Sequence, residues 1–511
     1  MTHQFKTLIS LLQFLDFGSS VAEIDNLLEV ARIETSAFTD LISDRVDLIP
    51  GTKGSGKSAL FRIFVDFLPD TLLKHRRVVV AHGIKAPGDP IFHAFGEQFS
   101  RLSEQEFISF WCIYLVSLAH EQFIKGDRYR EILKIARQET DQFRLACADA
   151  GIPEIAAPKS LREILQWVFQ VVKAWSPKLK YSPADKSGEW ELDLFGKSNT
   201  AEIKGKKHEL QKDLPKYINE ISEALEAVLN RSQLSLWLMI DRLDEIFPRR
   251  SDLEKRALRG LLRAMRYFAS NTIRVKVFLR DDMLDQVVRN GDGFTALTHI
   301  TARQSDTLRR TQDQILSMVV KRIFASEKMA SYLQVDKEKI EASSSYRSKC
   351  FYNVFPSTVY KGPNQSSTLR WICSRCADGR GVVTPRDVLD LLIRAKQKQY
   401  DECAASPDGV SDWIIGPLAL QYGFAELSKR KRQTYLEAEF PHLWKNIEKF
   451  IRGKTIYDER SLRNIFGTDW KGIIEDLVSI GLFSKTIKKN DPIYQIPFLY
   501  RDGLELTQGK A

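Results

Sequence analysis

The chain has 511 residues, 43% hydrophobic and 28% charged, a composition typical of a globular protein with room for several domains. A net charge of +10 is compatible with an anionic partner such as nucleic acid. The first residues lack the layout of a signal peptide, and the longest uncharged stretch, residues 107–119, is well short of the ~20 residues that a membrane span needs. With only six cysteines, we expect a cytoplasmic protein that does not enter a membrane.

The first strong pattern lies near the N-terminus. Residues 1–45 have helical spacing, and an apolar strand is expected at 46–50. Residues 51–58 then read Gly-Thr-Lys-Gly-Ser-Gly-Lys-Ser, which fits the phosphate-binding pattern G-x-x-x-x-G-K-[ST]. Helical spacing resumes at Ala59, so that a bound phosphate would lie at a helix N-terminus.

Each residue type in this loop suits a nucleoside triphosphate. Its glycines allow successive N–H groups to point at phosphate oxygens. Lys57 would reach the β- and γ-phosphates, and the Ser58 hydroxyl would ligate Mg²⁺. The predicted nucleotide-binding residues are Gly51, Thr52, Lys53, Gly54, Ser55, Gly56, Lys57, Ser58 and Ala59. The alternative is a glycine-rich turn without a ligand.

Alternating strands and helices predict an α/β fold with a parallel sheet over residues 46–330. A second buried strand is expected at 77–81, and a mainly helical insertion at 90–232. Within that insertion, residues 103–106 form a predicted capping box that opens a buried apolar helix at 107–120.

The sheet resumes at 234–240 with an apolar strand that ends in Asp241, the expected Mg²⁺ partner of Ser58. Asp244 or Glu245 would orient the attacking water. A further strand at 273–279 ends in Arg280, where a cation could stabilise charge on the γ-phosphate. A solvated acidic turn and an ordinary surface arginine are the alternatives.

Three further segments are predicted after the sheet: a helical lid at 331–400, a linker helix region at 401–435 and a winged helix at 436–511. In the lid, Arg386 begins a helix from which it could reach the nucleotide. The winged helix is expected from helices at 440–451, 459–466 and 470–480, followed by a hairpin at 482–496.

Several basic residues are candidates for nucleic-acid contact, with a solvated face or a protein-binding module as the alternative. They are Arg256, Arg259, Arg263 and Arg266 at helical spacing, Lys485, Lys488 and Lys489 in the hairpin, and the run at 429–432. Cys373 and Cys376 form a lone C-x-x-C with no second pair, for which buried thiols are a better interpretation than zinc.

Taken in order, these motifs resemble the ATPases of the AAA+/STAND branch of P-loop proteins. Residues 51–58, 241–245, Arg280 and Arg386 match that branch's Walker A, Walker B, sensor 1 and sensor 2 positions. Residues 35–60 look similar to those of bacterial P-loop ATPases often found near antiviral defence genes. The long insertion and the lack of a clear arginine finger depart from the pattern.

The resemblance implies an ATP-driven switch with ATP and Mg²⁺ as cofactors, and it does not specify a target. We expect an ATP-hydrolysing switch that acts on or senses nucleic acid, with double-stranded DNA as a candidate partner and antiphage defence as a candidate role. The alternative is a nucleotide-dependent scaffold that regulates a partner effector protein, with slow hydrolysis. Homo-oligomerisation is compatible with either function.

Overall fold

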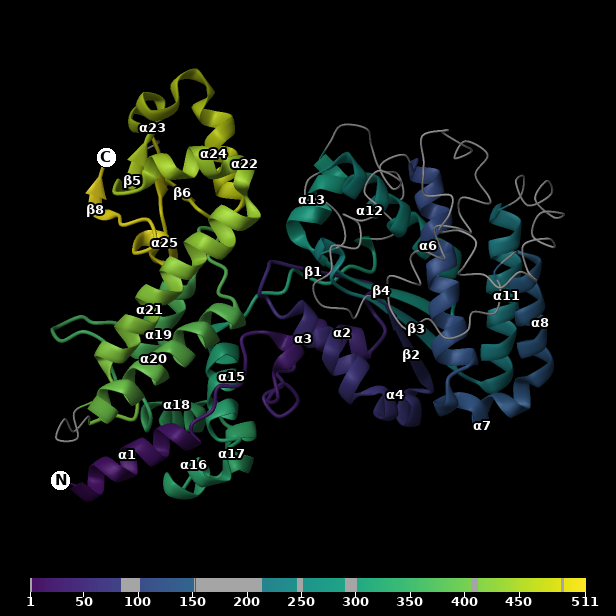
Figure 1. Cartoon of the computed structure of the whole chain (residues 1–511), viewed down its shortest axis with the longest axis horizontal. Coiled ribbons are helices and arrows are strands. Elements are labelled where there is room, and N and C mark those ends of the chain that lie inside the picture. Colours follow the sequence, from purple (N-terminus) through teal and green to yellow (C-terminus); the bar gives the residue numbers. More distant parts are fainter. Residues whose placement is uncertain are drawn as a thin grey trace, which may run out of the picture. The chain divides into compact units, whose positions relative to one another are not determined.

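The computed structural model describes residues 2–83, 102–150, 152, 214–245, 251–289, 301–405, 412–488 and 491–511. Most of the predicted insertion lies outside this range, including a helix expected at 161–175. The chain divides into two compact units (Figure 1). We call residues 36–51 and 60–307 the sheet unit, and residues 1–35, 52–59 and 308–511 the helical unit. Each is described by itself.

The described residues of the sheet unit form four strands and the helices that cover them. Its strands are β1 (Leu48–Gly51), β2 (Val78–Gly83), β3 (Ser235–Ile240) and β4 (Ile273–Arg280). Its helices are α2 (Ser36–Ile42), α4 (Pro69–Arg76), α6 (Glu104–Ala119), α7 (Arg130–Leu133), α8 (Arg137–Asp149), α11 (Leu214–Ser232), α12 (Asp252–Ala264) and α13 (Asp281–Arg289). Helix α3 (Lys57–Arg62) follows the phosphate loop and continues as a π-helical turn, Ile63–Phe67.

All four strands are parallel, in the order β1-β4-β3-β2. The predicted parallel sheet is therefore confirmed. Alternate side chains along a strand point to opposite faces. On one face, Leu236 and Leu238 belong to the core that includes α6 and α12. On the other face, Trp237 packs near Phe64, which follows α3. Both faces are covered, and this explains why the strands read as continuous apolar runs.

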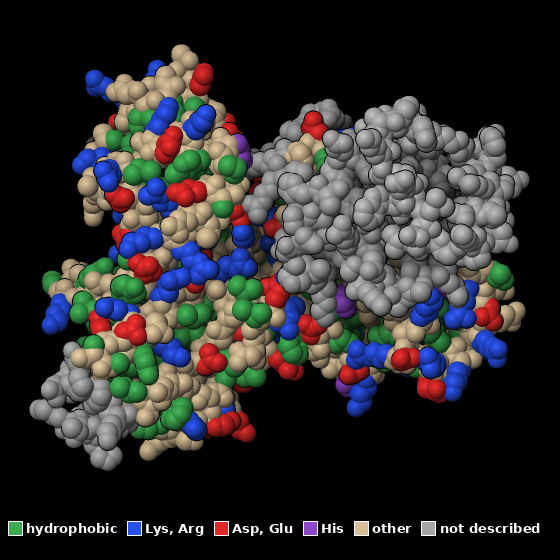
Figure 2. Space-filling view, in the orientation of Figure 1, with side chains coloured by type: hydrophobic (Ala, Val, Ile, Leu, Met, Phe, Trp, Pro, Cys, Tyr) green, Lys and Arg blue, Asp and Glu red, His purple; other side chains and the backbone are tan. Residues whose placement is uncertain are grey.

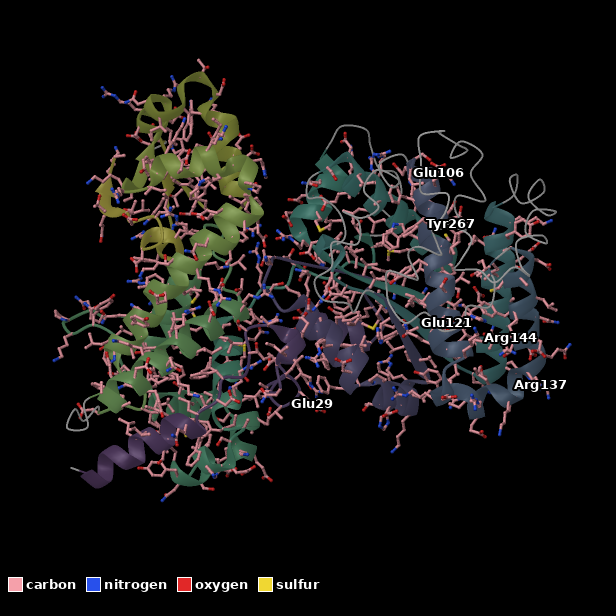
Figure 3. The ribbon with its side chains drawn as sticks, viewed as in Figure 1. Glu29, Glu106, Glu121, Arg137, Arg144 and Tyr267 are labelled. Carbon is pink, nitrogen blue, oxygen red and sulfur yellow. The ribbon has the colours of Figure 1, made fainter. Side chains whose placement is uncertain are left out.

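Helix α6 begins at the predicted capping box. Ser103 accepts a hydrogen bond from the Glu106 amide, and the Glu106 carboxylate accepts one from the Ser103 amide. Glu106, in the first turn of α6, is labelled in Figure 3. Trp111 donates a hydrogen bond to the carbonyl of Ala257 in α12. Residues Glu104–Ile124 are long and apolar enough to cross a membrane, but this segment is mostly buried inside the protein, as is usual for a core helix.

The helical unit has one continuous hydrophobic core. Its helices are α1 (Thr2–Phe14), α15 (Gln312–Ile323), α16 (Glu327–Tyr332), α17 (Lys337–Ala342), α18 (Ser344–Tyr352), α19 (Thr368–Cys376), α20 (Pro385–Ala405), α21 (Pro417–Lys431), α22 (Pro441–Ile447), α23 (Glu459–Phe466), α24 (Trp470–Ser479) and α25 (Phe498–Arg501). The sequence divided this region into lid, linker and C-terminal domain, whereas the structure groups all three in a single unit with residues 1–35.

The C-terminal part contains a mixed sheet of order β6-β7-β5-β8. Its strands are β5 (Lys454–Asp458), β6 (Ser484–Lys488), β7 (Asp491–Gln495) and β8 (Thr507–Lys510). The antiparallel pair β6 and β7 forms the predicted hairpin, and α22, α23 and α24 lie at the predicted helices. Strands β5 and β8 were not predicted: β5 has five residues directly before α23, and β8 has four residues after the last helix.

Candidate functional site

The phosphate loop has the backbone that its glycines were expected to provide. Gly54 and Gly56 have φ angles of +82° and +99°, in the left-handed region that other residues rarely adopt. The Lys57 ammonium donates a hydrogen bond to the Thr52 carbonyl at 2.9 Å, and the Ser55 amide donates to the same oxygen at 3.2 Å. The lysine thus folds back over the loop, where it can exchange this carbonyl for a phosphate oxygen.

Two hydroxyl groups in the loop are buried without a partner. The side chains of Thr52 and Ser55 belong to residues only 6% and 2% exposed, and neither hydroxyl oxygen has a hydrogen-bond partner among the described residues. A buried hydroxyl that has lost water without gaining a partner is costly. A ligand with several acceptor oxygens, such as a phosphate chain, fits this pair.

Residues far along the chain pack on the loop within the helical unit. A Cβ atom at Gly54 would lie 3.1 Å from the Cβ of Arg386 and 3.2 Å from the Thr384 hydroxyl. A Cβ atom at Gly56 would lie 3.1 Å from Nη2 of Arg310. Arg386, which the sequence predicted, is therefore at the loop, and so is Arg310, which sequence reasoning missed.

An acidic side chain also contacts the loop. Glu439, just before α22, forms an ion pair with Lys53, the third residue of the motif. The Glu439 side chain is buried, with 2% exposure, whereas that of Lys53 is 34% exposed. No sequence pattern indicated Glu439, because it lies almost 390 residues from the loop and belongs to no motif.

In the sheet unit, three predicted site residues lie at the carboxyl edge of the parallel strands. Gly51 ends β1 and is the register partner of Arg280, which ends β4. Asp241 follows β3, whose last residue, Ile240, pairs with Val277 of β4. Ligands of open α/β sheets bind outside this edge. The sheet therefore brings Gly51, Arg280 and Asp241 to the edge where a ligand is expected.

Arg280 is held by two carboxylates. Its guanidinium donates to both oxygens of Asp282, at 2.9 and 2.8 Å, and lies 3.5 Å from Asp244. The side chain of Arg280 is 5% exposed and that of Asp244 is 24% exposed. Asp244 is thus accessible at the edge, while Asp282, two residues after the strand, fixes the arginine. The side chain of Glu245 lies outside the described residues.

The backbone changes direction immediately after the acidic strand. Asp241 is 2% exposed, and Arg242 has a φ angle of +61°. A non-glycine residue in this region is uncommon, and such residues concentrate at functional sites. This turn leads into the short 3₁₀ helix Leu243–Glu245, which carries both candidate water-orienting acids.

The arginines of α12 do not form an open basic stripe. Arg259 is buried, and its guanidinium lies 3.8 Å from the Glu104 carboxylate, which also pairs with Arg263 at 3.0 Å. Arg256 donates a hydrogen bond to the Leu102 carbonyl at 2.6 Å. Only Arg266 of the four is classed as exposed.

The basic run at 429–432 is neutralised within the helical unit. Its four residues pair with Glu426, Asp390, Asp387 and Glu437 in turn, at 2.8 to 3.0 Å. Lys485 of β6 is exposed, whereas the side chains of Lys488 and Lys489 lie outside the described residues. Figure 2 shows Lys and Arg lying among acidic and hydrophobic side chains on the visible face of this unit.

The two C-x-x-C cysteines lie in and at the end of α19. Burial raises the pKa of Cys373 to about 11 and that of Cys376 well above its ordinary value. Both are therefore thiols near neutral pH, poor ligands and poor nucleophiles. Within the described part of the chain, no three His, Cys, Asp or Glu residues are grouped so that they could hold a metal ion.

No protein-family model matches the sequence, and no curated protein matches it significantly.

Proposed function

We propose that this chain is an ATP-binding and ATP-hydrolysing molecular switch, with a P-loop ATPase sheet, a helical lid and a C-terminal winged helix. The main support for this proposal is the phosphate loop. Two of its glycines have positive φ angles, and the buried hydroxyls of Thr52 and Ser55 have no hydrogen-bond partner among the described residues. Both features suit the binding of a phosphate chain. The sequence resemblance to AAA+/STAND ATPases supports ATP as the nucleotide.

Each proposed role follows from the chemistry of the residue. Lys57 and the loop amides would hold the phosphates, and the Ser58 hydroxyl and Asp241 carboxylate supply the hard oxygen ligands that Mg²⁺ prefers. Bound Mg²⁺ would neutralise phosphate charge.

The hydrolytic residues would act at the γ-phosphate. Asp244 or Glu245 would orient water, while Arg280 and Arg386 would contact the γ-phosphate. Asp282 and Asp244 already hold the Arg280 guanidinium in place. This positive charge would therefore move little when the reaction occurs.

The ion pair between Lys53 and Glu439 supports a switch. A nucleotide brings several negative charges to a loop that already contacts a buried carboxylate. Phosphate and Glu439 would therefore compete for Lys53, and nucleotide binding would loosen the segment that leads into α22.

Glu439→Gln is expected to increase ATP affinity about fivefold, because it removes roughly 1 kcal/mol of charge repulsion. Binding would be measured by calorimetric titration at low salt. The matched control is Glu437→Gln, whose carboxylate pairs with Arg432 instead. Unchanged or weaker ATP binding by Glu439→Gln would count against the competition.

Two kinds of molecule are candidates for the target of the switch: nucleic acid and a partner effector protein. Net charge and the exposed Lys485 support nucleic acid. The similarity of residues 35–60 to bacterial ATPases found near antiviral defence genes makes antiphage defence a candidate role. A partner effector protein is supported by exposed apolar side chains, with Leu418 and Tyr422 one turn apart on α21 and 69% and 44% exposed, and Trp413 just before it. The internal pairing of residues 429–432 and of Arg259 and Arg263 favours this second candidate.

ATP turnover with and without double-stranded DNA, at two salt concentrations, separates these targets. Phosphate contacts weaken steeply with salt because counterions are released on binding. DNA stimulation that disappears at high salt, and that Lys485→Ala reduces, would support a nucleic-acid sensor. Turnover indifferent to DNA at both salt concentrations would support the effector-protein alternative.

A further inference from the structure

Arg310 lies in the segment that enters the helical unit, and its position is fixed by the helix that follows it. Thr311 is the N-cap of α15: its hydroxyl accepts a hydrogen bond from the Gln314 amide, and the Gln314 side chain accepts one from the Thr311 amide. This capping box sets the direction of the chain at Arg310. The guanidinium of the half-buried Arg310 lies against Gly56, the residue that follows the buried Ser55 in the phosphate loop.

The charge of Arg310 has no counterion in the part of the chain that the structure describes. Its one hydrogen bond to a described residue is a long one, 3.5 Å, to the carbonyl of Arg309. Burial lowers the pKa of Arg310 to about 10, so the side chain remains a cation near neutral pH although it is partly desolvated. Holding a charge away from water without a partner is unfavourable.

Three other arginines of the helical unit are paired with acids. Arg322 pairs with Asp25, Arg347 with Asp313 and Arg380 with Asp378. Arg386, which lies against Gly54 of the loop, is like Arg310 in having no acidic partner among the described residues. Its one hydrogen bond to a described residue is donated to the Ser20 carbonyl. Two arginines from distant segments thus contact the same loop, and neither is paired with an acid among the described residues.

We propose that Arg310 is a nucleotide-binding residue that contacts the phosphate chain of the bound nucleotide, beside Arg386. This inference rests on the proposed function. The anion that Arg310 lacks is the phosphate, and planar guanidinium groups bind phosphate oxygens through charge-assisted hydrogen bonds. Arg310 therefore supplies the phosphate-binding site with a further positive charge, from a residue outside the motif at 51–58.

The test compares ATP, ADP and AMP binding by the full chain and three variants, Arg310→Gln, Arg310→Lys and Arg309→Gln, by calorimetric titration with Mg²⁺. Arg310→Gln is expected to weaken ATP and ADP binding at least about tenfold, with less effect on AMP. Arg310→Lys should recover part of the loss, because it keeps the charge. Arg309→Gln is the matched control, since Arg309 is an exposed neighbour, and it should bind as the wild type does.

Thermal unfolding without nucleotide separates a phosphate contact from a structural role. A lower unfolding temperature with unchanged ATP affinity in both Arg310 variants would overturn the inference, as would equal losses for ATP and AMP. If the wild type binds ATP and Arg310→Gln binds it equally well, only this inference fails. If the wild type itself does not bind ATP, the proposed function fails with it.

Discussion

Lys57→Ala is expected to abolish ATP binding. The Lys57 ammonium already lies over the loop, bonded to the Thr52 carbonyl, and alanine can neither replace its charge nor reach a phosphate oxygen. A ligand that binds only the folded state stabilises it, by about 2.7 kcal/mol at a concentration 100 times its Kd. We therefore expect MgATP to raise the unfolding temperature of the wild type by several degrees and that of the variant not at all.

The control for this experiment is Lys74→Ala. Lys74 is exposed on α4, and its loss removes the same charge away from the loop. This variant should keep the full nucleotide-dependent shift. Equal shifts in the wild type, Lys57→Ala and Lys74→Ala would mean that ATP binds elsewhere or that the loop does not use its lysine.

Asp244→Asn is expected to separate binding from hydrolysis. Its carboxylate is partly exposed at the edge of the sheet, 3.5 Å from the fixed Arg280, where it could orient water. Removing a general base or water-orienting group costs about 10²-fold or more in turnover. Because Asp244 is not part of the phosphate loop, ATP affinity should change little.

Glu245→Gln belongs in the same experiment, because both acids lie on the short helix after β3. Steady-state phosphate release and ATP affinity would be measured for each variant, with Asp306→Asn, an exposed acid in the same unit, as the control. At least one of the two variants should bind ATP normally and turn over slowly. Wild-type turnover in both would contradict an acidic water-orienting residue at this position.

The sheet was predictable because its strands are apolar and are bounded by polar residues. Residues 234–240 and 273–279 have the composition of strands buried on both faces, and both appear as β3 and β4. The loop was predictable because its spacing requires glycine at the positive-φ positions 54 and 56. Local patterns of this kind are set by neighbouring residues, so the sequence reveals them directly.

The surroundings of the loop could not be predicted in the same way. Arg310, Thr384 and Glu439 lie hundreds of residues from the motif, and only the packing of the helical unit brings them to it. Charge patterns were also misleading. Arg259 and Arg263 share a helix spacing that suggests a basic face, but α6 supplies Glu104 to both. Whether a basic residue is available to contact nucleic acid depends on acidic partners that lie far away in the sequence. The spacing of the basic residues does not reveal those partners.

The central claim is that this chain hydrolyses ATP at the phosphate loop. The most direct measurement is release of inorganic phosphate from ATP by the purified chain, with and without Mg²⁺, beside Lys57→Ala prepared identically. The account predicts phosphate release that requires Mg²⁺ and that Lys57→Ala lacks. Equal release by both proteins, or none by the wild type under conditions where it is folded, would contradict it.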